Sequence, residues 1–370
     1  MAFPPLDRDA IIGCLLGQAV GDMMGLPAEN LSPRRIAKLF PKFDRPRFFF
    51  GYGMASDDTE HACMTAQALL RSGGDRRRFS TSLGWRLRWW FAGMPAGIGK
   101  ATARACIRLW LGRSSENSGV YSAGNGPAMR AAIMFVTAGL EDEISRRLGM
   151  DVSWPMKYWP WLTEITQITH YDFQALYGVT AVYRAAEFAE GGRGKPFDSD
   201  GALLWLNFCW TDEDDFSHNL NRIEPAYRAS RSLSEFAAEL NLSRGVTGYI
   251  AHTVPVAIYA FLKHPDDYRS AIESVIRLGG DTDTVAAITG ALVGIRVGKA
   301  GIPPEWLNRY ADWPRSVAWM ESLGERLAEG SWRETPQPAV RLAWWVIPFR
   351  NFVFFLIVLG HIFRRMLPPY

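Results

Sequence analysis

The stretch RLGGDTDTVAAITG, residues 277–290, joins a polar beginning to an apolar continuation. A pair of glycines precedes Asp281 and Asp283, and each aspartate is followed by a threonine. From Val285 onward the side chains are small and apolar, a pattern that predicts a tightly packed helix. Two carboxylates and two hydroxyls therefore stand at the N-terminus of a helix that is suited to a protein core. Such a position serves either for capping the helix or for binding a ligand.

The composition is typical of a globular protein with a large core. Of the 370 residues, 48% are hydrophobic, 21% are charged and 15 are Trp. The 41 basic residues exceed the 38 acidic ones by only three, which argues against a nucleic-acid partner. Four scattered cysteines without a CxxC pattern argue against a disulfide framework or a structural zinc site. Because the N-terminal MAFPPLDRDA is too polar for a secretory signal, we expect a cytoplasmic protein.

Helical patterns dominate the chain, and alternating strand patterns are scarce. In the segment 10–24, glycines recur every four residues, at 13, 17, 21 and 25, and leave a bare stripe where another backbone can approach. Further helices are predicted at 59–71, 83–91, 101–111, 127–138, 173–189, 232–240, 247–262, 267–277 and 284–297, and the longer connections at 141–171 and 190–217. The sequence therefore predicts an all-α fold, a compact multi-helix bundle over residues 1–331 with an apolar C-terminal tail over 332–370.

The tail contains the apolar run FVFFLIVLGHIF at residues 352–363. This run is well short of the ~20 residues that a membrane-spanning helix needs. Extending it back to Trp344 adds Pro348, Arg350 and Asn351, which are costly at the centre of a membrane. Three interpretations stay open: a buried or oligomer-forming helix, a helix lying on a membrane surface, and a membrane span. Arginines at 341, 350, 364 and 365 suit an anionic surface, so peripheral membrane contact through the tail is one expectation.

Two acidic motifs of similar design each begin a predicted helix: SDDTE at 56–60 and GGDTDT at 279–284. One interpretation is capping, since Ser, Thr and Asp satisfy free N–H groups at a helix N-terminus and complement the helix dipole. A single carboxylate achieves that, whereas Asp57 pairs with Asp58 and Asp281 pairs with Asp283. Four carboxylates brought together would repel one another unless a cation lay between them. Ligands that are all oxygen indicate Mg²⁺, with Mn²⁺ or Ca²⁺ as alternatives, and two acidic pairs suggest two ions.

A third motif, SAGNGPAMR at 122–130, has the features of an anion-binding turn. Gly124 and Gly126 allow the backbone to approach a ligand closely, and Pro127 suits the first turn of a helix. The N–H groups at that helix N-terminus would face an anion such as a phosphate or pyrophosphate. The alternative is a Gly-Asn-Gly turn with no ligand.

The motifs together resemble the ADP-ribosylglycohydrolase family. GCLLGQAVGDMMGLPAE, SDDT, SAGNGPAMRAAI, ITH and GGDTDTVAAITGALVG occur in the order of that family, over roughly residues 11–307. Its members include the dinitrogenase-reductase-activating glycohydrolase and the ADP-ribosylarginine and ADP-ribosylserine hydrolases. The resemblance implies an all-α fold with a dinuclear Mg²⁺ centre that holds ADP-ribose at its distal ribose.

Residue by residue, the resemblance also implies a site. The metal ligands would be Ser56, Asp57, Asp58, Asp281, Asp283 and Thr284. The catalytic residues would be Glu29, which matches a mobile acid near the anomeric carbon, and Asp57. The substrate-binding residues would be Gly99, Gly124, Asn125, Gly126, Met129 and His170. Asp22 is interpreted as a residue that positions a helix and not as a metal ligand.

The implied activity is hydrolysis of the bond between ADP-ribose and a modified protein side chain, with arginine as the expected acceptor. Such a cleavage passes through an oxocarbenium-like state that flanking carboxylates stabilise. One departure concerns the acceptor: several arginine-type members carry an Asp where this chain has Gly97, in PAGIGKAT. The base is then supplied elsewhere, or the acceptor differs.

Two other functions are weighed. One is an immunity-type protein that binds and neutralises an ADP-ribosylating toxin, and the other is a catalytically silent ADP-ribose-binding or structural member. The short N-terminus argues against a plug at that end, and the intact acids argue against the silent member. The expected partner is therefore an ADP-ribosylated protein substrate.

Overall fold

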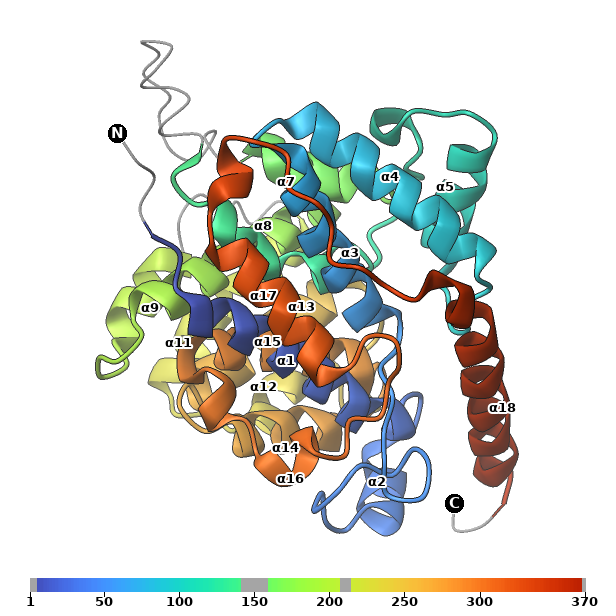
Figure 1. Cartoon of the computed structure of the whole chain (residues 1–370). Coiled ribbons are helices and arrows are strands. Elements are labelled where there is room, and N and C mark those ends of the chain that lie inside the picture. The colour runs from blue at the N-terminus through green and yellow to red at the C-terminus, as the bar shows by residue number, and fades with distance from the viewer. Residues whose placement is uncertain (1–4, 141–158, 207–213, 368–370) are drawn as a thin grey trace.

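The computed structural model describes residues 5–140, 159–206 and 214–367 (Figure 1). Within these ranges the chain forms α-helices and short 3₁₀ helices, joined by loops with isolated β-bridges and no sheet. The predicted all-α fold class is confirmed. The α-helices are α1 (Arg8–Gly25), α2 (Pro33–Leu39), α3 (Asp57–Ser72), α4 (Arg76–Ala92), α5 (Lys100–Trp110), α7 (Trp159–Gln167), α8 (Phe173–Gly191), α9 (Ser199–Leu206), α10 (Asp215–Asn221), α11 (Ile223–Arg228), α12 (Leu233–Glu239), α13 (Ile250–Lys263), α14 (Tyr268–Leu278), α15 (Thr282–Val297), α16 (Pro304–Leu307), α17 (Val317–Ala328) and α18 (Ile347–Arg365). The 3₁₀ helices are η1 (Leu26–Ala28), η2 (Ser115–Asn117), η3 (Ala128–Arg130), η4 (Ala132–Thr137), η5 (Lys299–Gly301), η6 (Ser331–Arg333) and η7 (Trp344–Val346).

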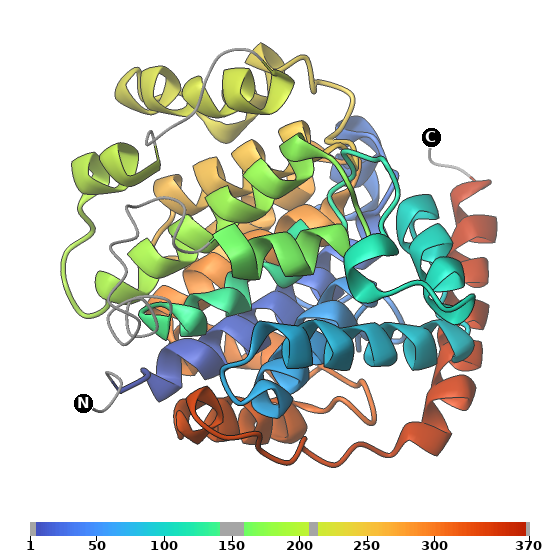
Figure 2. The same ribbon diagram turned by 90° about the horizontal axis from the view of Figure 1, so that it is seen from above.

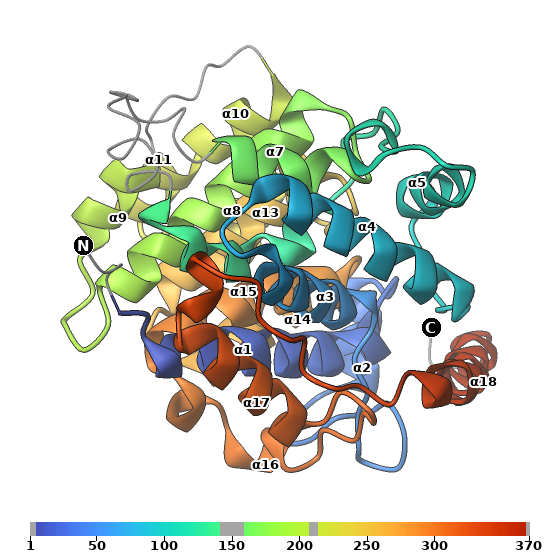
Figure 3. The ribbon, with the colours of Figure 1, turned by 45° about the horizontal axis from the view of Figure 1, so that its top comes forward.

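Helices α1 and α15 pack backbone to backbone in the middle of the molecule (Figure 3). A Cβ atom at Gly13 would overlap the carbonyl of Gly294, and one at Gly17 would overlap the carbonyl of Gly290. The same holds for Gly21 against the carbonyl of Ala286. The glycine stripe predicted from the sequence is therefore the surface on which α15 lies, and it admits no larger side chain. Both helices are buried over almost their whole length.

Most predicted helices begin and end within a few residues of the observed ones, with the exceptions of 83–91, where α4 begins at Arg76, and 127–138. The latter segment forms η3 and η4, which are 3₁₀ helices, and not one α-helix. Its buried Arg130 bonds away from the segment, to the carbonyl of Ile165 at 2.9 Å and to the ring of His61 at 2.7 Å. These tertiary contacts accompany the tighter winding. The predicted connections 141–171 and 190–217 also contain helices, namely α7, α9 and α10.

The C-terminal segment crosses the surface before it forms α18 at one edge of the molecule (Figures 1 and 2). Two helices among the described residues are long and apolar enough to cross a membrane: Arg8–Ala28, whose apolar 18-residue window is fully buried in the core, and Trp344–Arg365, whose apolar window is 22% buried. The two polar residues that interrupt the apolar tail, Arg350 and Asn351, are buried against the protein. Arg350 donates to the Asp312 carboxylate, and Asn351 donates to the carbonyl of Gly93 at 2.7 Å. The division at residue 331 stays a prediction, as does the role of the tail.

Candidate active site

The two acidic motifs meet because the N-termini of α3 and α15 face each other in the core. Ser56 is the N-cap of α3, and its hydroxyl accepts from the Asp58 amide at 3.2 Å. Across the gap, the Thr284 hydroxyl donates to the Asp58 carboxylate at 3.1 Å. Asp281 occupies the N-cap position of α15 but makes no capping bond with its side chain. Capping therefore accounts for Ser56 and leaves Asp281 and Asp283 without that explanation.

Asp22, on α1, holds the N-terminus of α3 in place. Its fully buried carboxylate accepts from the Ser56 amide at 2.9 Å, from the Thr59 amide at 3.1 Å and from the Thr59 hydroxyl at 2.6 Å. Burial raises the pKa of Asp22 to about 6, although these hydrogen bonds lower it. Asp22 lies on α1 one residue after Gly21, so the glycine contact with α15 also sets its position. These bonds agree with the interpretation of Asp22 as a residue that positions a helix, whereas its exclusion as a metal ligand stays a prediction.

The carboxylates of the site disfavour ionisation in the polypeptide alone. Burial is the largest cause that raises the pKa of Asp57, Asp58, Asp281 and Asp283, and neighbouring carboxylates raise it further for three of them. One oxygen of Asp58 and one of Asp283 are buried without any hydrogen-bond donor. In residues 5–140, 159–206 and 214–367, however, no three Asp, Glu, His or Cys side chains already converge as a metal cage. The fit to a hard cation thus rests on the oxygen donors and on these two unpartnered oxygens.

The Gly-Asn-Gly loop lies directly against the second acidic motif. The Asn125 amide donates to the Asp281 carboxylate at 2.6 Å and to the Thr253 hydroxyl at 2.9 Å. A Cβ on Gly126 would come within 2.9 Å of the His170 ring, so only glycine fits there. Thr102, in the first turn of α5, also borders Gly126. The structure thereby brings together the loop, His170 and the start of α5, where Gly99 is the N-cap.

His170 is a neutral side chain in this arrangement. It is 3% exposed, and its Nδ1 lies 2.9 Å from the Thr169 hydroxyl. Burial lowers the pKa of His170 to about 3, and the nearby Arg130 guanidinium lowers it in the same direction. His170 therefore presents an uncharged ring to the Gly-Asn-Gly loop at neutral pH. The structure places His170 beside the Gly-Asn-Gly loop, whereas its role in a substrate cleft stays a prediction.

Gln18 connects the motifs, and the sequence analysis did not single it out. From α1 its amide donates to the carbonyl of Asp58 at 2.8 Å and to the carbonyl of Met129 at 2.5 Å. Met129, predicted as a substrate-binding residue, is thus held by its backbone, and its side chain is buried. The signal available in the sequence was a single amide between Gly17 and Gly21 in an otherwise small and apolar stretch. Such a side chain in a core helix needs partners, which here are the two site segments.

Glu29 lies close to the second acidic motif, because the Asp281 carboxylate affects its ionisation. It follows η1, and the next residue, Asn30, donates its backbone N–H to the carbonyl of Gly280 at 2.7 Å. Burial raises the pKa of Glu29 and so does Asp281, whereas Arg365 of α18 lowers it. Glu29 and Gly97 both line a cavity of about 650 Å³. The position where arginine-type relatives were expected to carry an Asp therefore faces the same space as Glu29.

Comparison with known proteins agrees with this arrangement. A family model described as ADP-ribosylglycohydrolase matches residues 4–336. The chain belongs to the ADP-ribosylglycohydrolase family. It is accordingly an enzyme of the class that hydrolyses glycosidic bonds to ADP-ribose.

Two relatives and one solved structure illustrate the likeness to this family. ADP-ribosylarginine hydrolase Tri1 of Pseudomonas putida is 26% identical over 349 residues, which are 90% of this chain and 81% of that protein. ADP-ribosylhydrolase ARH3 of Homo sapiens is 36% identical over 261 residues, or 64% of this chain and 67% of that protein. A chain of an ADP-ribosylglycohydrolase-related protein complex matches with a TM-score of 0.62 at 25% identity, covering 88% of this chain and 98% of that one. The fold of the family thus extends over most of this chain.

Proposed function

We propose that this enzyme removes ADP-ribose from a modified protein side chain in a reaction that depends on Mg²⁺, with Mn²⁺ as the alternative ion and arginine as the first acceptor to test. The observation that carries the proposal is the meeting of two acidic helix N-termini, linked by the hydrogen bond from Thr284 to Asp58. The arginine acceptor is supported by the likeness to the ADP-ribosylarginine hydrolase.

The ions would be held by the oxygens of the two motifs: Ser56, Asp57, Asp58, Asp281, Asp283 and Thr284. When bound, divalent ions orient the ribose hydroxyls and a water molecule and make that water more acidic. The protein would add a rigid platform, because the motifs begin helices that are packed in the core. Asn125 would transmit the position of the ADP-ribose loop to this platform through its bond to Asp281.

The remaining residues would place and cleave the substrate. Gly126 lies beside Thr102 in the first turn of α5, and the N–H groups at this helix N-terminus, after Gly99, would suit a pyrophosphate held between α5 and the backbone of Gly124 and Asn125. The neutral His170 would border the bound ADP-ribose without repelling or attracting its charge. Positive charge develops at the anomeric carbon as the bond to the acceptor breaks, and the Glu29 carboxylate would stabilise it and accept a proton from the attacking water.

The test is release of free ADP-ribose from ADP-ribosyl-arginine and ADP-ribosyl-serine proteins in parallel, with Mg²⁺ and with EDTA. We expect metal-dependent release from one linkage. The site variant is Asp283→Asn, and its matched control is Asp200→Asn. The Asp200 side chain lies in α9 and is 79% exposed, so the same substitution there leaves the site unchanged. Equal loss of activity in both variants would contradict the assignment. No release from either protein, with ADP-ribose still bound, would favour a capturing or silent protein.

A further inference from the structure

Helix α18 forms one wall of the cavity that contains Glu29. The cavity lies between the end of η1, the loop 94–97 and one face of α18, and that face contributes Phe352, Phe355, Val358, Ile362 and Arg365. None of residues 124–126 is among its lining residues. The cavity therefore includes Glu29, whereas the loop that would hold the ADP-ribose contributes no residue to its lining. Figure 1 shows α18 running along this edge, beyond the main bundle.

The beginning of α18 is anchored to the same helix that carries the first acidic motif. Arg350 lies 3.4 Å from the Glu60 carboxylate of α3 and donates to the carbonyl of Ala55, next to Ser56, at 2.5 Å. Its bond to Asp312 completes a buried ion network. Because Arg350 is 6% exposed, removing these partners would strand a buried charge. The start of α18 is consequently fixed relative to the site.

The end of α18 also contacts the segments around the site. His361 lies 2.8 Å from the carbonyl of Phe48, and Arg35 donates to the carbonyl of Arg365. The Arg365 guanidinium interacts with the Glu29 and Asp283 carboxylates, which oppose the effect of burial on its pKa. The wall is therefore apolar along its length and cationic where it approaches Glu29.

We propose that this cavity is a binding site for the acceptor protein, and that α18 selects the residues that flank the ADP-ribosylated side chain. The occupant is an apolar segment of that protein, because the wall and the facing residues Leu26, Phe48 and Met94 are apolar. If Glu29 acts at the scissile bond, a cavity that includes Glu29 but none of residues 124–126 is the space open to the acceptor. This inference rests on the proposed function. Helix α18 lies beyond the family match, which ends at residue 336, so the family model does not describe this wall.

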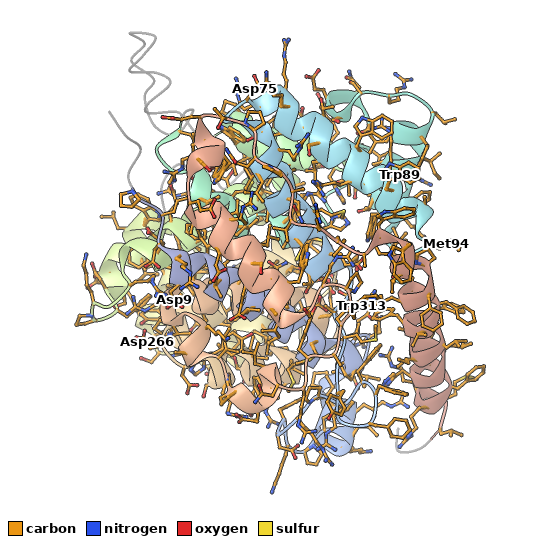
Figure 4. The ribbon with its side chains drawn as sticks, viewed as in Figure 1. Asp9, Asp75, Trp89, Met94, Asp266 and Trp313 are labelled. Atoms are coloured by element: carbon orange, nitrogen blue, oxygen red, sulfur yellow. The ribbon has the colours of Figure 1, made fainter. Side chains whose placement is uncertain are left out.

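The test compares two pairs of phenylalanines on the same helix. Phe352 and Phe355 line the cavity, whereas Phe349 and Phe363 do not, and Phe352 and Phe363 are equally exposed at 58% and 59%. Figure 4 shows this helix with side chains of neighbouring elements such as Met94 beside its beginning. The substrates are an ADP-ribosylated peptide with apolar flanking residues and the same ADP-ribosylated amino acid alone, using whichever linkage the wild-type enzyme cleaves.

We expect Phe352→Ala with Phe355→Ala to raise KM for the peptide about tenfold, as loss of a central contact in an interface does, and to leave kcat/KM for the free amino acid within about twofold. The pair Phe349→Ala with Phe363→Ala should leave both substrates unchanged. Equal loss with both substrates, equal loss in both pairs, or no change in the peptide KM overturns the proposal. Binding to anionic phosphatidylglycerol vesicles that only the Phe352 and Phe355 pair loses would overturn it in favour of a membrane surface. If the wild-type enzyme cleaves neither substrate, the proposed function fails and this inference fails with it.

Discussion

Replacing Asp283 by asparagine should stabilise the metal-free protein while it abolishes activity. Asp283 is 6% exposed, one of its oxygens has no hydrogen-bond donor, and burial together with the carboxylates of Glu29 and Asp281 raises its pKa well above the ordinary value. Its ionised form therefore opposes folding at neutral pH. Relief of one such buried charge is worth about 1–3 kcal/mol on the scale of unsatisfied buried polar groups. In a chain of this size that amounts to a rise of about 1–4 °C in Tm in the presence of EDTA.

The stabilisation by Mg²⁺ should move in the opposite direction. A ligand at 100 times its Kd stabilises the native state by about 2.7 kcal/mol, and the variant should lose most of that gain because one ligand charge is missing. The assay is thermal unfolding of wild type, Asp283→Asn and the control Asp200→Asn in EDTA and over a Mg²⁺ titration. A variant with lower Tm in EDTA and an unchanged response to Mg²⁺ would refute the reasoning, since Asp283 would then be a structural residue.

The other predictions follow from the site, the core and α18. Because the pKa values of Asp58 and Asp283 are raised in the folded protein, their protonated forms stabilise it at low pH, and this stabilisation is lost as the pH rises through the raised pKa values. Mg²⁺ should therefore raise Tm more at pH 8 than at pH 5.5, and an equal rise at both pH values would contradict this. Gly17→Ala should lower the free energy of unfolding, measured with denaturant, by about 1–3 kcal/mol, because the added Cβ overlaps α15. Gly360→Ala has open space around it and should stabilise α18 slightly. Similar effects of the two substitutions would count against the packing argument. Arg365→Gln should move the acidic limb of the kcat/KM profile to higher pH, because Arg365 lowers the pKa of Glu29, and an unmoved limb would exclude Glu29 as the titrating group. Gly97→Asp should fold, because no atom lies near the added Cβ, at a cost of about 1 kcal/mol for the positive φ. It should also raise hydrolysis of ADP-ribosyl-arginine relative to ADP-ribosyl-serine. An unchanged ratio in parallel release assays would show that residue 97 does not determine the acceptor.

The sequence was a good guide wherever local periodicity decides the structure. The spacing of glycines in residues 10–24 predicted the close approach of another backbone, and α15 makes it. The helix beginning at Thr282 was likewise predicted from its small apolar residues. What the periodicity could not supply was the partner of each surface. The hydrogen bond between Thr284 and Asp58 joins residues 226 positions apart, and no local pattern predicts it.

For the C-terminal tail, too, the sequence did not predict which residues it contacts. Its composition allowed a buried helix, a helix on a membrane surface or a span, because an apolar run records that a segment avoids water and not what covers it. Arg350 and Asn351 were weighed as obstacles to a membrane span, and Arg350 also as a side chain that suits an anionic surface. In the structure they are the buried anchors of α18, bonded to Asp312 and to the carbonyl of Gly93. Partners so distant in the sequence decide which face of an apolar helix turns inward.

Helix α1 joins the packing of this protein to its chemistry. Gly17 and Gly21 let α15 approach, while the residues that follow them, Gln18 and Asp22, point to the site segments. Gln18 holds the carbonyls of Asp58 and Met129, and Asp22 holds the amides of Ser56 and Thr59. A side chain in place of either glycine would push α1 away from α15 and carry these supports with it. The absence of Cβ atoms on one face of α1 is therefore a condition for the arrangement of the acids, and not only for the density of the core.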